Sequence, residues 1–296
     1  IVNKENLGQF SYIKNRFPMI LRPILYNLVF KVFGSNPTFF RLINILFHMG
    51  NVFLVYLIVS LLYNNTAALI SSSLTAVHPV LIEAVSWISG GPYSTYTFFG
   101  LTSFLFFILS QKKQKYYWLF LASLGFAFLT SPISIVIPII LAAFVLTHKK
   151  FKFDWKMILP PLVIGLIAFV IFFPSISKRM YTLQTSYYQK TSFVNPLFLI
   201  PTAVTGYLEL IVWPSNLTLY HSEINSIGQT QYILRIIFFL IYLALTVYLF
   251  IKKRKDSFWL MLFLIALGPF LTPFGISWLL AERYAYFSAI GIFVFI

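Results

Sequence analysis

Ionisable side chains are scarce in this sequence, and several of them lie beside long apolar segments. Only seven of the 296 residues are acidic. One of them, Glu83, follows His78 in the segment Ala76–Tyr96, which also contains a proline, a tryptophan and a Gly-Gly-Pro sequence. An ionisable residue at the edge of a membrane is costly, so it usually serves a function. The segment therefore predicts a functional loop, although a capped helix end followed by a tight turn would have the same composition.

Two arginines stand where they could bind an oxyanion. Arg283 lies between Glu282 and Tyr284 near the C-terminus, and Arg22 precedes a proline at the start of an amphipathic segment. A guanidinium offers a planar fork of donors that matches the oxygens of a phosphate group. Both arginines are therefore predicted to bind phosphate. The alternative is that they anchor the protein at the membrane surface, where arginine side chains extend toward water.

The segment from Tyr207 to Glu223 combines aromatic rings with few carboxylates, and Glu209, Trp213 and His221 all lie in it. A pocket of this composition suits a sugar, whose faces stack on aromatic rings and whose hydroxyl groups need hydrogen-bond acceptors. An aromatic belt at a membrane interface has the same composition, so both interpretations remain open.

Four polar residues recur within an apolar segment at intervals of three or four positions. They are Arg41, Asn44, His48 and Asn51. This spacing places their side chains on one face of a helix. Within lipid, such a face either hydrogen-bonds to neighbouring helices or lines a cavity that contains water.

Composition and missing motifs exclude several classes of protein. The sequence has no cysteine, which excludes disulfides and thiolate metal sites. It contains no Walker A, H-E-x-x-H or G-x-S-x-G motif, so soluble-enzyme chemistries lack support. The net charge of +15 would suggest nucleic acid in a soluble protein. Here much of it lies in short loops between apolar segments, where it orients membrane helices and contacts lipid headgroups, so no nucleic acid partner is expected.

The elements that position these residues are predicted to be membrane helices. Hydrophobic residues make up 59% of the sequence, and apolar segments repeatedly reach the roughly 20 residues that a spanning helix requires. We therefore expect an all-α polytopic membrane protein. Its predicted spans are Phe39–Leu62, Thr66–Ile82, Tyr93–Ser110, a hairpin over Tyr116–Thr147 bent at Ser131-Pro132, Met157–Pro174, Gln229–Ile251 and Ser257–Ile276.

Three dense clusters of basic residues, at 112–115, 149–156 and 252–255, predict which side each loop faces. Such clusters mark the cytoplasmic side of a membrane protein. With all three inside, the apolar segment Pro196–Trp213 must begin and end outside, so we expect a re-entrant or interfacial helix there. Asp154 and Asp256 would then be ordinary solvated charges on the inside. The other acidic residues are expected outside, namely Glu5, Glu83, Glu209, Glu223 and Glu282.

We expect one domain over residues 1–296. It divides into an outer interfacial segment (1–38), six spans (39–174), outer loops with the re-entrant helix (175–228) and the last spans (229–296). The sequence has no initiator methionine and ends within an apolar segment, which indicates a fragment.

Five segments together resemble one family. They are Arg41–His48, Ala76–Gly90, Ser131–Pro138, Tyr207–His221 and Ala281–Tyr286. In this order they are similar to the transmembrane and tetratricopeptide-repeat O-mannosyltransferases and their prokaryotic relatives, which are glycosyltransferases of the GT-C type. The more specific motifs are His-Pro-x-x-x-Glu-Ala-Val-x-Trp-Ile-Ser-Gly and Ala-Glu-Arg-Tyr-x-Tyr. Two departures remove polar groups: Gly91-Pro92-Tyr93 stands where relatives have Arg-Lys-Asp or similar, and Ser131-Pro132 where they have Ser-Lys.

The resemblance implies a GT-C-like helical bundle with interfacial and re-entrant helices. It implies an enzyme that transfers a sugar, mannose or another hexose, from a polyprenyl- or dolichyl-phosphate carrier to a protein or glycan acceptor. The membrane would be a prokaryotic plasma membrane rather than the endoplasmic reticulum, with the active face outward. The partners are membrane lipids, the lipid-phosphate sugar and the acceptor; the resemblance leaves room for a divalent metal, but no metal-ligating residues are predicted.

The resemblance also implies roles for individual residues. The catalytic acid of the family would lie before Ile1, which leaves Glu83 as the candidate within this sequence. Arg283 and Arg22 would bind the donor phosphate. The predicted substrate pocket consists of His48, His78, Trp87, Tyr93, Glu209, His221, Glu282 and Tyr284. The alternative functions are a transporter or flippase of lipid-linked sugars and a non-catalytic membrane anchor for a repeat domain.

Overall fold

The computed structural model describes most of the chain, and its regular structure is entirely helical. The described residues are 10–14, 16–148, 155–185, 196–215, 217–218, 221, 228–271 and 280–296. Within them, four helices are long and apolar enough to cross a membrane. These are α3 (Pro37–Leu62), α6 (Gly91–Ser110) with the preceding 3₁₀ turn η3 (Ile88–Gly90), α9 (Trp155–Thr185) and α11 (Gln229–Ile251). The chain is a polytopic, all-α membrane protein, as the sequence predicted.

A bent pair of helices forms a fifth candidate span. α4 (Asn65–Val77) is followed by η2 (Pro79–Leu81) and α5 (Ile82–Ser86), and the two parts meet at 54°. Pro79 favours the break, because proline lacks the N–H that would continue the ladder and disfavours the helical conformation at the residue before it. His78 accordingly has extended backbone, with φ −66° and ψ 126°. The predicted span Thr66–Ile82 thus corresponds to this bent pair, with a break at His78 that was not predicted.

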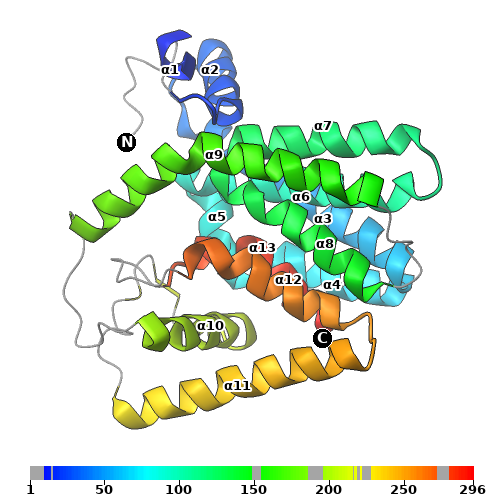
Figure 1. Ribbon diagram of the computed structural model, residues 1–296. Helices are drawn as coiled ribbons and strands as arrows, with labels where there is room; N and C mark the ends of the chain where they lie inside the picture. The colour runs from blue at the N-terminus through cyan, green and yellow to red at the C-terminus, as the bar shows by residue number, and fades with distance from the viewer. Residues whose placement is uncertain are drawn as a thin grey trace.

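The predicted hairpin within the long apolar segment is confirmed. α7 (Lys115–Thr130) ends at Ser131, and the chain reverses through η4 (Pro132–Ile135) into α8 (Val136–Thr147). Ser131 is extended, and its hydroxyl oxygen accepts a hydrogen bond from the Ile133 amide at 3.3 Å, which caps the next helix. In Figure 1 α7 runs along the top of the bundle, and α8 runs back below it in the opposite direction. Serine and proline are a common start for a helix, so the bend could be read from the sequence.

Two other predicted boundaries differ from the structure. The loop predicted from Ser175 begins later, because α9 continues to Thr185. Pro160, Pro161 and Pro174 lie inside this helix, where each removes at most one backbone hydrogen bond without ending it. The last predicted span, Ser257–Ile276, is helical as α12 (Ser257–Leu267) and η6 (Gly268–Phe270), and its predicted end lies outside the described residues.

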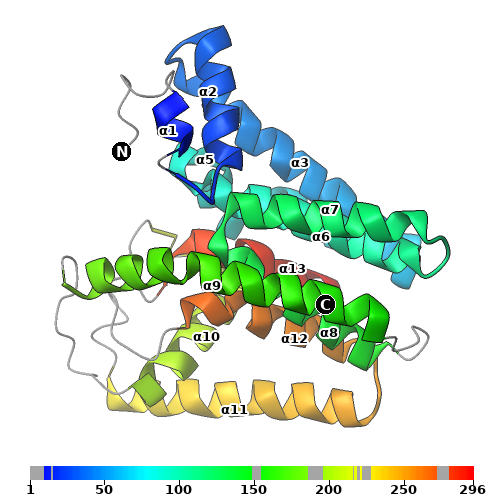
Figure 2. The same ribbon diagram turned by 45° about the horizontal axis from the view of Figure 1, so that its top comes forward.

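The bundle has two ends, which both views separate (Figures 1 and 2). We call the end where α5 meets η7 (Glu282–Tyr284) the site end. The opposite end contains the α6–α7 turn at 111–114 and the α11–α12 turn at 252–256; we call it the basic end. The α3–α4 turn also lies there, since the Tyr63 hydroxyl donates to Asp256 Oδ1 at 3.0 Å.

The core of the molecule is formed around α12 and α13 (Ala285–Phe295). From Ala285 to Phe293 every residue of α13 is buried, and α13 packs against α12, α4 and α6. Its contact with α12 is close, because a Cβ atom on Gly291 would lie only 2.4 Å from the Trp259 carbonyl oxygen. Small residues allow membrane helices to approach in this way. α13 thus fixes the position of η7, which directly precedes it.

Helix α10 (Pro196–Val212) is short, apolar and packed against α11. Its 17 residues give it a length of about 25 Å at 1.5 Å per residue. It is not among the candidate spans, and that is compatible with the predicted re-entrant or interfacial helix. At the other end of the sequence, α1 (Phe10–Lys14) and α2 (Leu21–Phe33) lie beside the site end (Figure 1).

Candidate functional site

At the site end, an ion pair joins Glu83 and Arg283, which lie 200 positions apart in the sequence. The Arg283 guanidinium binds Glu83 Oε1 through Nη1, and the Arg283 backbone amide donates to Glu83 Oε2 at 2.8 Å. Both residues are only 6% exposed. Both carboxylate oxygens of Glu83 are therefore occupied by Arg283. The pair ties α5 to η7 and gives the buried carboxylate a fixed position.

Aromatic rings surround the Arg283 guanidinium. Its Cζ lies 5.2 Å from the centre of the Trp87 ring and 4.9 Å from that of Tyr284. Tyr284 stacks on Phe270 with 4.2 Å between ring centres, and Tyr93 lies 5.7 Å from Tyr284. Arginine over an aromatic face is stabilised by the ring quadrupole. The Nε and Nη2 groups of Arg283 make no hydrogen bond to any described residue, so these donors remain for a ligand.

Glu282 points to a different partner from its neighbour Arg283. Its Oε1 accepts the Thr218 amide at 2.6 Å and lies 3.5 Å from His221 Nε2. Glu282 and His221 are both buried. The structure thus brings together two residues of the predicted substrate pocket that lie 61 positions apart in the sequence (282 − 221). His221 Nε2 makes no hydrogen bond to a described residue, so its contact with Glu282 is a close approach of the two groups and not a hydrogen bond.

Arg22 is buried in a network of neutral acceptors. Its guanidinium donates to Thr95 Oγ1 and Asn44 Oδ1, each at 2.9 Å, and to the Tyr26 hydroxyl. The side chain is 5% exposed, its Nε has no hydrogen-bond partner, and it forms no ion pair with a described residue. A buried cation normally pairs with an opposite charge. An anionic ligand would supply the charge that the described residues around Arg22 do not.

The network depends on a glycine at the start of α6. A Cβ atom added to Gly91 would lie 2.0 Å from both Arg22 Nη2 and Asn44 Oδ1. Any other residue would therefore displace the guanidinium. Gly91 and Pro92 do not form the separate tight turn considered from the sequence; they are the first residues of α6, where proline fits because its missing N–H has no helical partner.

The two arginines are linked through the segment between α5 and α6. Asn44 accepts from Arg22 and donates through Nδ2 to the Val85 and Trp87 carbonyl oxygens at 3.2 and 3.1 Å. The Trp87 ring in turn lies against Arg283. The segment between α5 and α6 therefore contacts Arg22 on one side and Arg283 on the other. The Asn44 side chain connects this segment to α3.

The polar stripe of α3 binds neighbouring helices. Asn44 and Asn51 are fully buried, and Asn51 donates to the Ser94 carbonyl at 2.9 Å and to the Tyr286 hydroxyl at 3.0 Å. His48 contacts Tyr286 through Nδ1 at 2.7 Å. Arg41 is exposed and takes no part. The interhelical interpretation is confirmed for both asparagines.

The remaining predicted pocket residues lie around α10. His78 Nε2 is 2.9 Å from the Ile211 carbonyl oxygen, so the break after α4 is tied to the end of α10. Glu209 pairs with Arg235 of α11 at 2.7 Å, and its side chain is 61% exposed. Glu209 thus faces away from the buried cluster. Glu5, Glu223 and Asp154 lie outside the described residues.

The family model of the dolichyl-phosphate-mannose-protein mannosyltransferases matches residues 18–177, which is more than half of the 296 residues. The chain belongs to this family. No curated protein and no solved structure is significantly similar to it. A dolichyl-phosphate-mannose-protein mannosyltransferase is a membrane glycosyltransferase, and membership implies a lipid-linked sugar as donor together with an acceptor.

The part that matches the mannosyltransferase family contains half of the site. Arg22, Asn44, Glu83 and Trp87 lie within residues 18–177, whereas Arg283 follows the matched part. The family match therefore covers the carboxylate of the central ion pair but not the guanidinium. Among the described residues, no three His, Asp or Glu side chains gather as a metal site would require.

Sequence reasoning missed the residues that surround Arg22 and Glu282. Tyr26 and Thr95 hold the Arg22 guanidinium, and Thr218 binds Glu282 through its backbone. Tyr26 follows Arg22 by four positions, a spacing that places both on one helix face, so that contact could have been read. A backbone donor from a distant loop leaves no signal in the sequence.

Proposed function

We propose that this protein transfers mannose from dolichyl- or polyprenyl-phosphate mannose to a protein hydroxyl group, with its reaction centre at the site end. Family membership supports the donor and acceptor classes, since the family description names both. The observation that carries the proposal is the pair of buried arginines, Arg22 and Arg283, on either side of the segment between α5 and α6. A phosphodiester donor needs such cations to stabilise its leaving phosphate.

Arg283 is the group proposed to hold the carrier phosphate. Nη1 is fixed by Glu83, so the guanidinium plane is set before a ligand arrives and the Nε and Nη2 donors point in a defined direction. Preorganised donors stabilise developing charge without a reorganisation cost. Glu83 acts in this proposal as a positioning residue, because both of its oxygens are already bound and it has no free oxygen to remove a proton.

The sugar and the acceptor would lie against the aromatic side of the cluster. Trp87 is 43% exposed, so its ring is available for a sugar face. Tyr93 and Tyr284 are buried, and Tyr284 packs against the Arg283 guanidinium. The reaction is an inverting displacement: the acceptor oxygen bonds to the anomeric carbon as the bond to the phosphate oxygen breaks. The acceptor proton passes to a carboxylate, and the Glu282–His221 pair could receive it among the described residues.

The test compares two Arg→Lys exchanges in the same chain. Arg283→Lys keeps the charge that pairs with Glu83 but loses the fork of donors. Liposomes containing the protein would receive radiolabelled dolichyl-phosphate mannose and a mixture of serine- and threonine-containing peptides. The rate of label transfer to peptide should fall by about 10²–10³, the usual effect of losing one transition-state donor.

The control is Arg41→Lys, which makes the same exchange at an exposed position of α3. Its transfer rate should stay within about twofold of the parent. A rate for Arg283→Lys equally close to the parent, with normal expression, would identify Arg283 as a surface anchor and exclude it from phosphate binding.

A further inference from the structure

A small cavity lies at the basic end, far from the ion pair of the site end. It has a volume of about 230 Å³ and is lined by Leu146, Thr147, Phe250, Ile251, Lys253, Arg254 and Ser257. A water molecule occupies about 30 Å³, so the cavity holds a group of several heavy atoms but not a large ligand. It lies between the last turn of α8 and the α11–α12 turn. Its lining combines an apolar floor with two cations.

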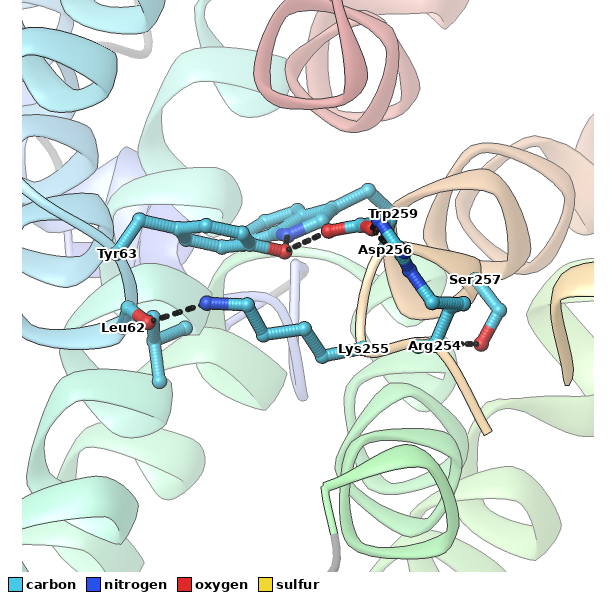
Figure 3. Close-up of polar contacts among 7 residues, drawn as sticks. All are labelled: Leu62, Tyr63, Arg254, Lys255, Asp256, Ser257 and Trp259. Atoms are coloured by element: carbon cyan, nitrogen blue, oxygen red, sulfur yellow. Dashed lines mark hydrogen bonds and ion pairs between the residues drawn. The ribbon is translucent and has the colours of Figure 1, made fainter. Parts of the chain in front are cut away.

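The four consecutive basic residues of the α11–α12 turn divide into two kinds. Lys255 Nζ donates to the Leu62 carbonyl at 3.0 Å and lies 3.6 Å from the centre of the Tyr63 ring, as Figure 3 shows. Lys252 Nζ lies over the Tyr248 ring at 5.8 Å. These two cations are used within the protein. Lys253 and Arg254 line the cavity, and Arg254 also pairs with Asp256.

Asp256 holds the turn in this arrangement. It accepts from Arg254 Nη2 at 3.2 Å and from the Tyr63 hydroxyl at 3.0 Å, and Tyr63 also accepts from Trp259 Nε1 at 2.8 Å (Figure 3). Burial and the nearby Asp256 charge raise the pKa of Tyr63, so its hydroxyl remains a donor. Asp256 is thus a fixed part of the turn, and the prediction of an ordinary solvated charge was wrong. Its carboxylate orients Arg254 at the cavity.

Lys253 has an unusual backbone for its residue type. Its φ of +58° lies in the left-handed region, which residues with a Cβ atom adopt at a cost and which glycine adopts freely. Its side chain makes no hydrogen bond or ion pair with a described residue. The end of α11 explains this backbone: the Lys253 amide donates to the Phe250 carbonyl and the Arg254 amide to the Leu249 carbonyl, each at 2.9 Å, as in a Schellman cap. The cap thus fixes where Lys253 leaves the helix, next to the cavity that it lines.

The cavity opens where lipid would surround the protein. Leu146, Phe250 and Ile251 are 60%, 42% and 66% exposed, and only 11% of the apolar stretch of α11 is buried inside the protein. These apolar side chains stand at the ends of membrane helices, next to two cations. Acyl chains and an anionic headgroup occupy the same relative positions in a bilayer.

We propose that this cavity binds the phosphate group of an anionic phospholipid, with Lys253 and Arg254 on the phosphate and the acyl chains along α8 and α11. Thr147 and Ser257 add hydroxyl groups at its wall. The ligand is a structural lipid distinct from the sugar donor, because the site end and the basic end lie at opposite ends of the bundle (Figure 1).

The test uses the whole chain in a neutral detergent and dioctanoyl phosphatidylglycerol as the probe. Binding of labelled protein is followed by thermophoresis. Three variants are compared: Lys253→Gly, Lys253→Gln and the matched control Lys252→Gln, which removes the same charge from the same turn. Both Lys253 variants should bind about fivefold more weakly, the usual effect of one cation near a lipid headgroup. Lys252→Gln should bind like the parent.

Lys253→Gly also separates binding from folding. Glycine relieves the left-handed backbone, so the thermal stability of this variant without lipid should equal or exceed that of the parent. The proposal is overturned if Lys252→Gln weakens binding as much as Lys253→Gln, which would indicate a diffuse charge effect. It is also overturned if dioctanoyl phosphatidylcholine binds as tightly, or if inorganic phosphate at equal concentration competes fully, which would indicate a site for free anions.

Discussion

At the scale of single residues, burial distinguishes the two ion pairs that join a glutamate to an arginine, Glu83–Arg283 and Glu209–Arg235. Glu83–Arg283 is almost fully buried, whereas Glu209–Arg235 is largely exposed on the glutamate side. Removing one partner of a buried pair leaves an uncompensated charge, which costs several kcal/mol. An exposed pair contributes little. The sequence suggested Glu83 as the catalytic candidate and Glu209 as a pocket residue, but it did not indicate that one is buried and the other exposed.

We predict different effects for the same exchange at these two glutamates. Glu83→Gln should lower the free energy of unfolding by about 3 kcal/mol, because it leaves the Arg283 charge buried without a counter-charge. Glu209→Gln should lower it by less than about 1 kcal/mol. Unfolding in mixed micelles of detergent and dodecyl sulfate would measure both. Equal losses would mean that the Glu83–Arg283 pair is not desolvated.

Gly91 gives a second prediction at this scale. Gly91→Ala places a methyl group where the Arg22 guanidinium lies, so Arg22 must lose its bonds to Asn44 and Thr95. We expect a loss of at least about 2 kcal/mol, since buried polar groups would be left unsatisfied. The melting temperature in detergent should fall, whereas Gly125→Ala, with open space around its Cβ, should leave it unchanged or raise it.

At the scale of helices, the apolar segments could be predicted and their breaks only in part. Long hydrophobic runs identify spans because a bilayer admits few other structures. Ser131-Pro132 was correctly read as a bend. No break at Pro79 was predicted within the span Thr66–Ile82. The predicted helix end at Pro174 is wrong, because α9 continues to Thr185. A proline permits both outcomes, and tertiary packing decides between them.

The position of α10 relative to the membrane can be tested by labelling. Thr182 and Gln229 are exposed on either side of α10, and the chain has no cysteine of its own. If α10 does not cross, cysteines at these two positions should react with an impermeant maleimide from the same side of sealed vesicles. Reaction from opposite sides would mean that α10 is a span.

At the scale of the whole molecule, the family and the class of fold could be predicted, but the assembly of the site could not. Hydropathy and short motifs are local properties of the sequence. The packing of distant helices decides which glutamate pairs with Arg283. It also decides that neutral acceptors surround Arg22. No local pattern contains that information.

We predict that the site end faces outward and the basic end inward. The dense basic turns at the basic end are the expected cytoplasmic signal. Asn36 lies exposed before α3 at the site end, and Lys113 lies exposed in the α6–α7 turn. A cysteine at Asn36 should label in intact cells with an impermeant reagent, and one at Lys113 only in inverted vesicles. The reverse result would place the reaction centre on the cytoplasmic side.

The separation of Glu83 and Arg283 by 200 positions also sets an order of events during synthesis. At about 5–20 residues per second, Glu83 emerges from the ribosome roughly 10–40 s before its partner. During that interval the Glu83 carboxylate has no counter-charge, and burying it unpaired would cost several kcal/mol. The contact between α5 and η7 can therefore form only after Arg283 has been synthesised, so the site end is among the last parts of the protein to assemble.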